Sequence, residues 1–190
     1  MTGEELEDFI DAAAQAVASL RLVSDKLLLA ANDMVRVLKN GGKVLAAGNG
    51  GSAAEAMHLA EELSGRYRQN RRALPGIALC ADGSALTCIG NDFGFDNVFA
   101  RQVEAFGKPG DMLALFSSSG NSKNLLEAVA AARRGGLRVV SLLGRGGGAL
   151  RGLSDIEIIV PGTESGAHAQ EAHQVALHAL LEFVEAEFAE

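Results

Sequence analysis

The sequence predicts an α/β protein with a doubly wound, five-stranded parallel sheet and helices on both faces. Short apolar runs alternate with helical segments throughout the 190 residues, and no linker, internal repeat or low-complexity segment separates them. Hydrophobic residues make up 48% of the chain, but only 5% of the residues are aromatic and none is Trp. Such a core of Ala, Val, Leu and Ile is typical of helices packed on a mostly parallel sheet, and we expect one domain over residues 1–190.

Two helices are predicted before the first strand. Residues 3–20 carry an apolar stripe with helical spacing. A second helix is expected from Ser24, as its N-cap, to Leu38, where an Asn-Gly-Gly sequence ends it. Since the sheet does not need these helices to close its core, we interpret residues 1–40 as a helical extension used in oligomerisation.

The remaining elements follow from the apolar runs and the turn residues between them. Strands are expected at residues 44–48, 75–80, 111–116, 139–143 and 156–160. Helices are expected after the first strand up to residue 64, at 82–92 with a polar turn, at 97–106, after the third strand up to 134, and at 168–188. Residues 144–148, rich in glycine, are predicted to form a loose loop.

A glycine-rich loop, GNGGS at residues 48–52, follows the first strand and opens into an alanine-rich helix. Gly48, Gly50 and Gly51 permit backbone conformations and close approaches that a Cβ would block. Ser52 is expected to cap the helix, whose free N–H groups favour an anion. The loop lies at the carboxyl edge of the sheet, where such sheets bind ligands. Two interpretations stay open, a ligand cradle and a tight structural turn.

The third strand runs into a second polar loop, SSSGNS at residues 117–122, ahead of a long helix. Its hydroxyl groups, its backbone amides and the helix N-terminus together favour a phosphate group. The loop has no Walker lysine, which argues against cleavage of a nucleoside triphosphate. We interpret the loop as a phosphate site, and the alternative is a capped turn without a ligand.

Imidazole, carboxylate and amide side chains recur at helical spacings that place them on shared faces. His58 and Glu62 are four residues apart, so they can share a metal ion or act on one substrate; the alternative is a solvated surface pair. In the last helix, Gln170 and His178 are eight residues apart and lean to one flank, whereas His173 points away from His178.

The charge pattern and the cysteines limit the partners and the compartment. A net charge of −7 argues against a general nucleic-acid surface or an anionic membrane partner. A local basic cluster suits an anionic sugar or a subunit contact; it consists of Arg66, Arg68, Arg71 and Arg72. Cys80 and Cys88 show no paired metal spacing and are expected as free thiols in a reducing compartment. The acidic N-terminus is unlike a signal peptide and no apolar run is long enough to span a membrane, so we expect a soluble cytoplasmic protein.

Four strings resemble the sugar isomerase (SIS) family, and most closely the bacterial phosphoheptose isomerases: GNGGSAAEAMHLAEELSGRY, CIGNDFGFDNVFARQVEA, SSSGNS and QEAHQVALH. The similarity covers nearly the whole chain, including the two leading helices. The resemblance implies the flavodoxin-like SIS fold and an enzyme, an aldose–ketose isomerase that interconverts D-sedoheptulose 7-phosphate and D-glycero-D-manno-heptose 7-phosphate through an enediol. That reaction begins ADP- or GDP-heptose biosynthesis, usually for lipopolysaccharide or another surface glycan.

The resemblance also implies a homotetramer with sites shared between subunits and one zinc ion per subunit. The residues that match the family's metal ligands are His58, Glu62, Gln170 and His178. Of these, Glu62 and His178 would form the acid/base pair that moves the proton between C1 and C2. Zinc would polarise the substrate oxygens.

Residues that match the family's sugar phosphate contacts come from several parts of the chain. They are Asn49, Gly50, Gly51, Glu62, Asn91, Asp92, Ser117, Ser118, Ser119, Ser122 and Gln170, and Ser52 of the first loop is included with them. One departure is that relatives often read Asp-Arg-Ile where this chain has Ala167-His168-Ala169. The alternative function is a non-catalytic SIS protein that binds a replication initiator or senses sugar phosphates. Retention of all four metal-ligand types favours the enzyme, and isomerisation of a different phosphosugar is a further alternative.

Overall fold

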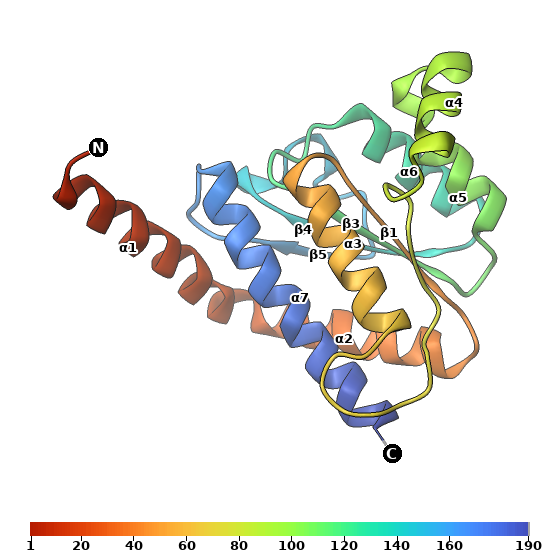
Figure 1. The fold of residues 1–190 in the computed structure, drawn as a ribbon, viewed down its shortest axis with the longest axis horizontal. Helices are drawn as coiled ribbons and strands as arrows, with labels where there is room; N and C mark the ends of the chain where they lie inside the picture. Colours follow the sequence, from red (N-terminus) through yellow and green to blue (C-terminus); the bar gives the residue numbers. More distant parts are fainter. Residues whose placement is uncertain (190) are drawn as a thin grey trace.

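The computed structural model describes residues 1–189, which contain one five-stranded parallel sheet (Figure 1). Its order is β2-β1-β3-β4-β5. The strands are β1 (Val44–Gly48), β2 (Gly76–Ala78), β3 (Met112–Ser117), β4 (Arg138–Leu143) and β5 (Ile156–Ile159). The parallel register pairs Val44 of β1 with Gly76 of β2 and Met112 of β3. This is the flavodoxin-like order, so the predicted doubly wound sheet is confirmed.

Helices connect the strands close to the expected positions. They are α1 (Gly3–Ser19), α2 (Ser24–Lys39), α3 (Gly51–Ser64), α4 (Gly83–Phe93), α5 (Ala100–Phe106), α6 (Lys123–Arg134) and α7 (Gly166–Phe188), with 3₁₀ segments η1 (Leu20–Val23), η2 (Phe95–Asn97) and η3 (Arg145–Leu150). None of the helices in the described part of the chain is both long and apolar enough to cross a membrane.

Two hydrophobic cores cover the two faces of the sheet. One core joins α2, α3 and α7 to strand residues such as Val44 and Met112, while the other joins α5 and α6 to residues such as Leu45 and Leu113. Successive side chains of β1 therefore enter opposite cores, which explains why the strand is apolar without alternation. Figure 1 shows α3 and α7 side by side over one face.

The first helix extends away from the body of the molecule (Figure 1). Thr2 and Glu5 form a capping box at its start, and Ala16 is its one buried residue in the described chain. Apolar side chains remain exposed along it, namely Leu6, Phe9 and Ile10. The helix α4 likewise stands off the sheet and buries no residue within the described chain.

Three details differ from the sequence predictions. Ser52 does not cap α3: the N-cap is Gly50, which has φ +58°, and Ser52 lies inside the first turn with its side chain buried. Residues 144–148 form an ordered turn rather than a loose loop: they overlap η3, but Gly146, Gly147 and Gly148 have positive φ and are not helical, and the Asn121 carboxamide accepts from the N–H of the next residue, Ala149. β2 is shorter than residues 75–80 because the chain turns directly after Ala78, where the Ala81 N–H donates to the Ala78 carbonyl at 3.2 Å.

Candidate active site

The two polar loops meet at the point where the strand order reverses. β1 and β3 are neighbours, but the chain leaves β1 toward β2 on one side and continues from β3 to β4 on the other. Doubly wound sheets bind ligands at this switch point, at the carboxyl ends of the strands. Asn49 after β1 and Asn124 in the first turn of α6 exchange two amide hydrogen bonds of 2.9 Å, which join the loops. The sequence analysis did not single out Asn124, although its place in the first turn of a helix behind a polar loop was visible.

A small polar cavity of about 170 Å³ lies between these loops and is lined by Asn49, Ser52, Phe116, Ser117, Ser118, Ser119 and Ser122. The Ser117 hydroxyl accepts from the Gly120 N–H at 3.0 Å, so it shapes the loop. Ser122 is the N-cap of α6, but its hydroxyl makes no capping hydrogen bond within the described residues. Its hydroxyl and the N-terminus of α6 are therefore available to an anion in this cavity.

The histidine and glutamate of α3 face a histidine of α7. The His58 Nε2 lies 3.2 Å from the Glu62 Oε1, one helical turn away. The His58 and His178 rings meet edge to face with centroids 5.2 Å apart. The structure thus brings together three of the four residues predicted as metal ligands. All three side chains are partly exposed, so a ligand can reach them from solvent.

Gln174, which the sequence analysis did not select, lies between the two histidines. Its Nε2 is 2.7 Å from the His58 Nδ1 and 3.2 Å from the His178 Nε2. The residue is four positions after Gln170 and four before His178, so helical spacing already placed all three on one flank of α7. The sequence signal was therefore present, but which of the two glutamines faces α3 depends on how the helices pack.

Gln170 lies one turn nearer the glycine-rich loop. A Cβ at Gly51 would collide with the Gln170 carboxamide, so Gly51 is required by this close approach. Gln170 thus connects the start of α7 to the β1–α3 loop, whereas Gln174 contacts the histidines. Within residues 1–189, no hydrogen bond joins Gln170 to His58 or His178.

A group of donor atoms on α3 can hold a metal ion. Ligand atoms of His58, Glu61 and Glu62 lie within 4.8 Å of one another. Imidazole nitrogen and carboxylate oxygen are the donor types that zinc and related divalent ions accept. Glu61 was not predicted, although its spacing of three from His58 was visible in the sequence.

Tyr67 adds an aromatic wall beside His178. Its ring is stacked on the imidazole with centroids 5.9 Å apart, and its hydroxyl donates to the Glu182 carboxylate at 3.1 Å. Desolvation and the neighbouring Glu182 charge raise the pKa of Tyr67 above its ordinary value. The phenol therefore keeps its proton at neutral pH and acts as a donor.

The predicted basic cluster serves contacts inside the chain. The guanidinium of Arg71 is fully buried, pairs with Glu185 of α7 at 3.3 Å and donates to the backbone oxygens of Glu62 and Leu63. Arg68 pairs with Glu182. The cluster therefore ties the end of α3 and the following loop to α7, and Arg71 is not a free cation for a sugar or a subunit.

Asn91 and Asp92 are not brought to the other candidate residues. They lie near the end of α4, their side chains are exposed, and the Asn91 amide donates to the Asp92 carboxylate at 2.6 Å. Among residues 1–189, no hydrogen bond connects them to α3, α7 or the serine loop.

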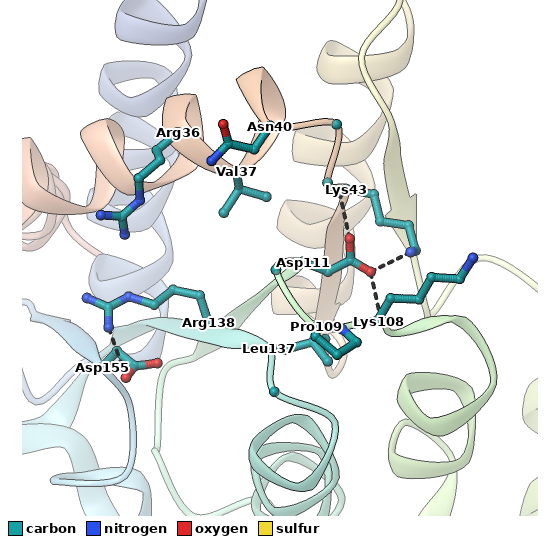
Figure 2. Close-up of a pocket in the computed structure, with 14 residues that line it drawn as sticks. Arg36, Val37, Asn40, Lys43, Lys108, Pro109, Asp111, Leu137, Arg138 and Asp155 are labelled. Carbon is teal, nitrogen blue, oxygen red and sulfur yellow. Dashed lines mark hydrogen bonds and ion pairs between the residues drawn. The ribbon is translucent and has the colours of Figure 1, made fainter.

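A larger cavity of about 530 Å³ opens at the opposite, amino edge of the sheet (Figure 2). Several of its charged groups are engaged with each other: Asp111 accepts from Lys43 and from the backbone N–H of Lys108, and Arg138 pairs with Asp155 at 3.1 Å. Because none of the predicted site residues lines it, this cavity is separate from the candidate active site.

Comparison with known proteins agrees with this architecture. Residues 8–144 match the SIS domain, and the chain belongs to the SIS domain family. The phosphoheptose isomerase of Haemophilus ducreyi is 46% identical over 188 residues, which cover 97% of this chain and 94% of that protein. The phosphoheptose isomerase of Campylobacter concisus is 51% identical over 162 residues, 85% of each chain.

A solved structure gives the same result in three dimensions. The phosphoheptose isomerase of Francisella tularensis superposes with a TM-score of 0.93 at 36% identity, covering 98% of this chain and all of that one. The predicted resemblance is therefore confirmed, and the relatives at this level of identity are isomerases rather than non-catalytic binders.

Proposed function

We propose that the protein is a phosphoheptose isomerase, which interconverts D-sedoheptulose 7-phosphate and D-glycero-D-manno-heptose 7-phosphate. The observation that carries the proposal is the meeting of His58 and Glu62 of α3 with His178 of α7, where α3 begins at the loop that lines the polar cavity of the switch point. Relatives that are 46% and 51% identical to this chain over the aligned residues carry that name. The reaction would begin ADP- or GDP-heptose synthesis for a surface glycan such as lipopolysaccharide, in the cytoplasm.

The reaction moves a proton between C1 and C2 through an enediol, which needs an acid/base group near those carbons. Glu62 is proposed to accept and return this proton, and its 15% exposed side chain lies 3.2 Å from His58. His178 is the second acid/base group and handles the proton of the neighbouring oxygen. Gln174 bonds both imidazoles and is proposed to orient them.

The phosphate group is proposed to bind in the serine-lined cavity. Ser118, Ser119 and Ser122 offer hydroxyl donors there, and the N-terminus of α6 favours negative charge. Asn49, Gly50, Gly51 and Ser52 would contact the sugar from the first loop, joined by Gln170. Neutral donors and backbone amides suffice for this task, so the loop needs no lysine.

Zinc is the metal proposed for the site, one ion per subunit. The fit rests on the donor atoms of α3 within 4.8 Å and on the second imidazole facing them. His58, Glu62 and His178 would hold the ion, with Gln170 as the fourth ligand by resemblance. When bound, zinc would polarise the substrate's carbonyl and hydroxyl oxygens. Glu62 would then have to combine a ligand's role with proton transfer.

The active assembly is proposed to be a homotetramer with composite sites. The exposed apolar residues of α1 and the unburied α4 suit contacts with other copies of the chain. Asn91 and Asp92 lie apart from the serine loop within one chain, so they would act on substrate bound mainly by another subunit. Neither nucleic acid nor membrane is a proposed partner.

Turnover of a substrate panel tests the proposed reaction. Sedoheptulose 7-phosphate should be isomerised faster than five- and six-carbon ketose phosphates, and purified protein should contain about one zinc per subunit. A non-catalytic sugar phosphate sensor would bind without turnover. Composite sites are tested by refolding a mixture of the Glu62→Gln and Asp92→Ala variants: activity should return in mixed tetramers, and no recovery would mean that each site is built from one chain.

A further inference from the structure

A second His/Glu pair lies between α3 and α7, and the proposed proton transfer uses neither member. Glu55 is three residues before His58 on α3, and His173 is three residues after Gln170 on α7. Glu55 is 5% exposed and His173 is fully buried. The pair therefore occupies the interface of the two helices one turn nearer the substrate loops.

The polar atoms of the pair have no other partner within residues 1–189. Both carboxylate oxygens of Glu55 and both ring nitrogens of His173 are buried without a hydrogen bond, and the shortest distance between the groups is 3.6 Å, from Oε2 to Nδ1. Buried polar groups in native proteins are nearly always hydrogen-bonded, since leaving them unpaired is costly. Each group is thus the available partner of the other, and a small side-chain movement forms the bond.

The position of the pair connects the three elements that carry the site. The ring of Phe116 meets His173 edge to face, with centroids 6.4 Å apart, and Phe116 directly precedes the serine loop. The buried Ser52, beside the first loop, is one turn before Glu55. The pair therefore lies under both loops, where β3, α3 and α7 meet.

A buried ion pair links the loop after α3 to α7 at the other end of the two helices. Arg71 pairs with Glu185 on α7 and donates to the backbone oxygen of Glu62, the last site residue of α3. The site residues thus lie between the two links along both helices: His58 and Glu62 on α3, Gln174 and His178 on α7. Ala56 and Ala172 are fully buried in the same core, and their small side chains do little to fix the helices along their axes.

We propose that Glu55 and His173 form a directional buried link that sets the position of α3 against α7 and so holds His58 and Glu62 opposite His178. Both are positioning residues, because neither is placed to touch substrate. The proposal rests on the proposed function of the site. It assigns to the pair a specific effect on turnover, beyond the general contribution of a buried contact to stability.

The test compares Glu55→Leu with the double variant Glu55→Leu, His173→Leu. The single change leaves the imidazole unpartnered and can prevent folding, whereas replacing both partners by apolar groups is often neutral for stability. The folded double variant is expected to lose at least about tenfold in kcat with KM changed less than about threefold, since small misplacements of reacting groups are costly. Zinc retention should fall, and amide hydrogen exchange of residues 51–64 should become faster.

Two further variants separate positioning from stability. Asp111→Asn removes the ion pair of a comparably buried carboxylate with Lys43 at the amino edge of the sheet (Figure 2), and it should lower the melting temperature without changing kcat. Glu55→Gln keeps the size and can donate to a ring nitrogen, so it should retain more kcat than Glu55→Leu.

A folded double variant with wild-type kcat, zinc content and hydrogen exchange would overturn the proposal. The proposal would also be overturned if Asp111→Asn lowered kcat as much as the double variant does. Failure of the proposed function has a different signature, because the wild-type protein would then be inactive on the whole substrate panel. In that case the hydrogen exchange of residues 51–64 still decides whether the link positions α3: faster exchange supports it and unchanged exchange contradicts it.

Discussion

Replacing Glu62 with glutamine separates proton transfer from metal binding at the candidate site. The carboxylate is 15% exposed, and its Oε1 lies 3.2 Å from the His58 Nε2. Glutamine has nearly the same size and presents a carbonyl oxygen to a metal or to His58, but it cannot accept a proton at neutral pH. The fold should tolerate the change, because the Arg71 bond at this position uses the Glu62 backbone oxygen.

The expected loss follows from the role of the group. Removing a general acid/base usually costs about 10²- to 10⁴-fold in rate, which corresponds to about 2.7–5.4 kcal/mol of activation free energy. Sugar phosphate binding and most of the zinc should be retained, since the serine-lined cavity and the two histidines are unchanged. The loss should therefore appear in kcat rather than in KM.

Three measurements on the purified variant distinguish the roles. Steady-state kinetics with the ketose phosphate gives kcat and KM, metal analysis gives the zinc per subunit, and NMR follows exchange of the C1 and C2 hydrogens with solvent. The exchange should disappear with turnover. Glu104→Gln on α5 is the matched control: its side chain is 51% exposed and pairs with Arg134, away from the candidate site, so kcat should stay within about threefold of wild type. Near-normal turnover by a zinc-containing Glu62→Gln variant would refute the acid/base role and leave Glu62 as a ligand only.

Three further outcomes test neighbouring parts of the chain. Gln174→Ala should weaken zinc binding by about 10- to 100-fold in a chelator competition, as expected for a group that orients metal-ligating histidines; unchanged affinity would mean that the amide only occupies space. Ser122→Ala should raise KM by about 10- to 100-fold, the equivalent of about 1.5–3 kcal/mol, without lowering the melting temperature, because the hydroxyl makes no capping bond in the described chain. Burial raises the pKa of the Cys80 thiol, so a thiol reagent at pH 8 should label the exposed Cys88 first. Mass spectrometry of the peptides measures the order of labelling, and labelling of Cys80 before Cys88 would contradict this prediction.

The sequence was sufficient to predict the sheet because its central strands β1, β3 and β4 are buried on both faces and end at polar or glycine-rich turns. β1 and β3 illustrate this, since all of their residues are buried and their loops lie at the switch point. The boundaries that were wrong depend on contacts across the fold. Whether Ser52 caps α3 depends on the left-handed conformation of Gly50, and the ordering of η3 depends on Asn121 from another loop.

Helical spacing predicted the pairing of His58 with Glu62, because both belong to one helix. It could not predict which side chains of α7 oppose them, since that depends on the rotation and axial offset of two packed helices. Gln174 was missed for this reason, and so was the partnership of Glu55 with His173. The role of the basic cluster could not be predicted for the same reason. Arg71 resembles a surface cation in the sequence, because its partner Glu185 is more than a hundred residues away along the chain.

The departure at Ala167-His168-Ala169 affects the packing of the first turn of α7 rather than the donor groups of the site. The His168 ring lies 4.6 Å from that of Phe9 on α1, and its Nδ1 is 2.9 Å from the Glu171 Oε2. Ala169 of α7 is fully buried and packs against Gly144, directly after β4, where a Cβ added to Gly144 would lie only 2.7 Å from the Ala169 Cβ. Since Gln170 is the next residue, any effect of the departure on turnover should act through the position of that carboxamide beside Gly51.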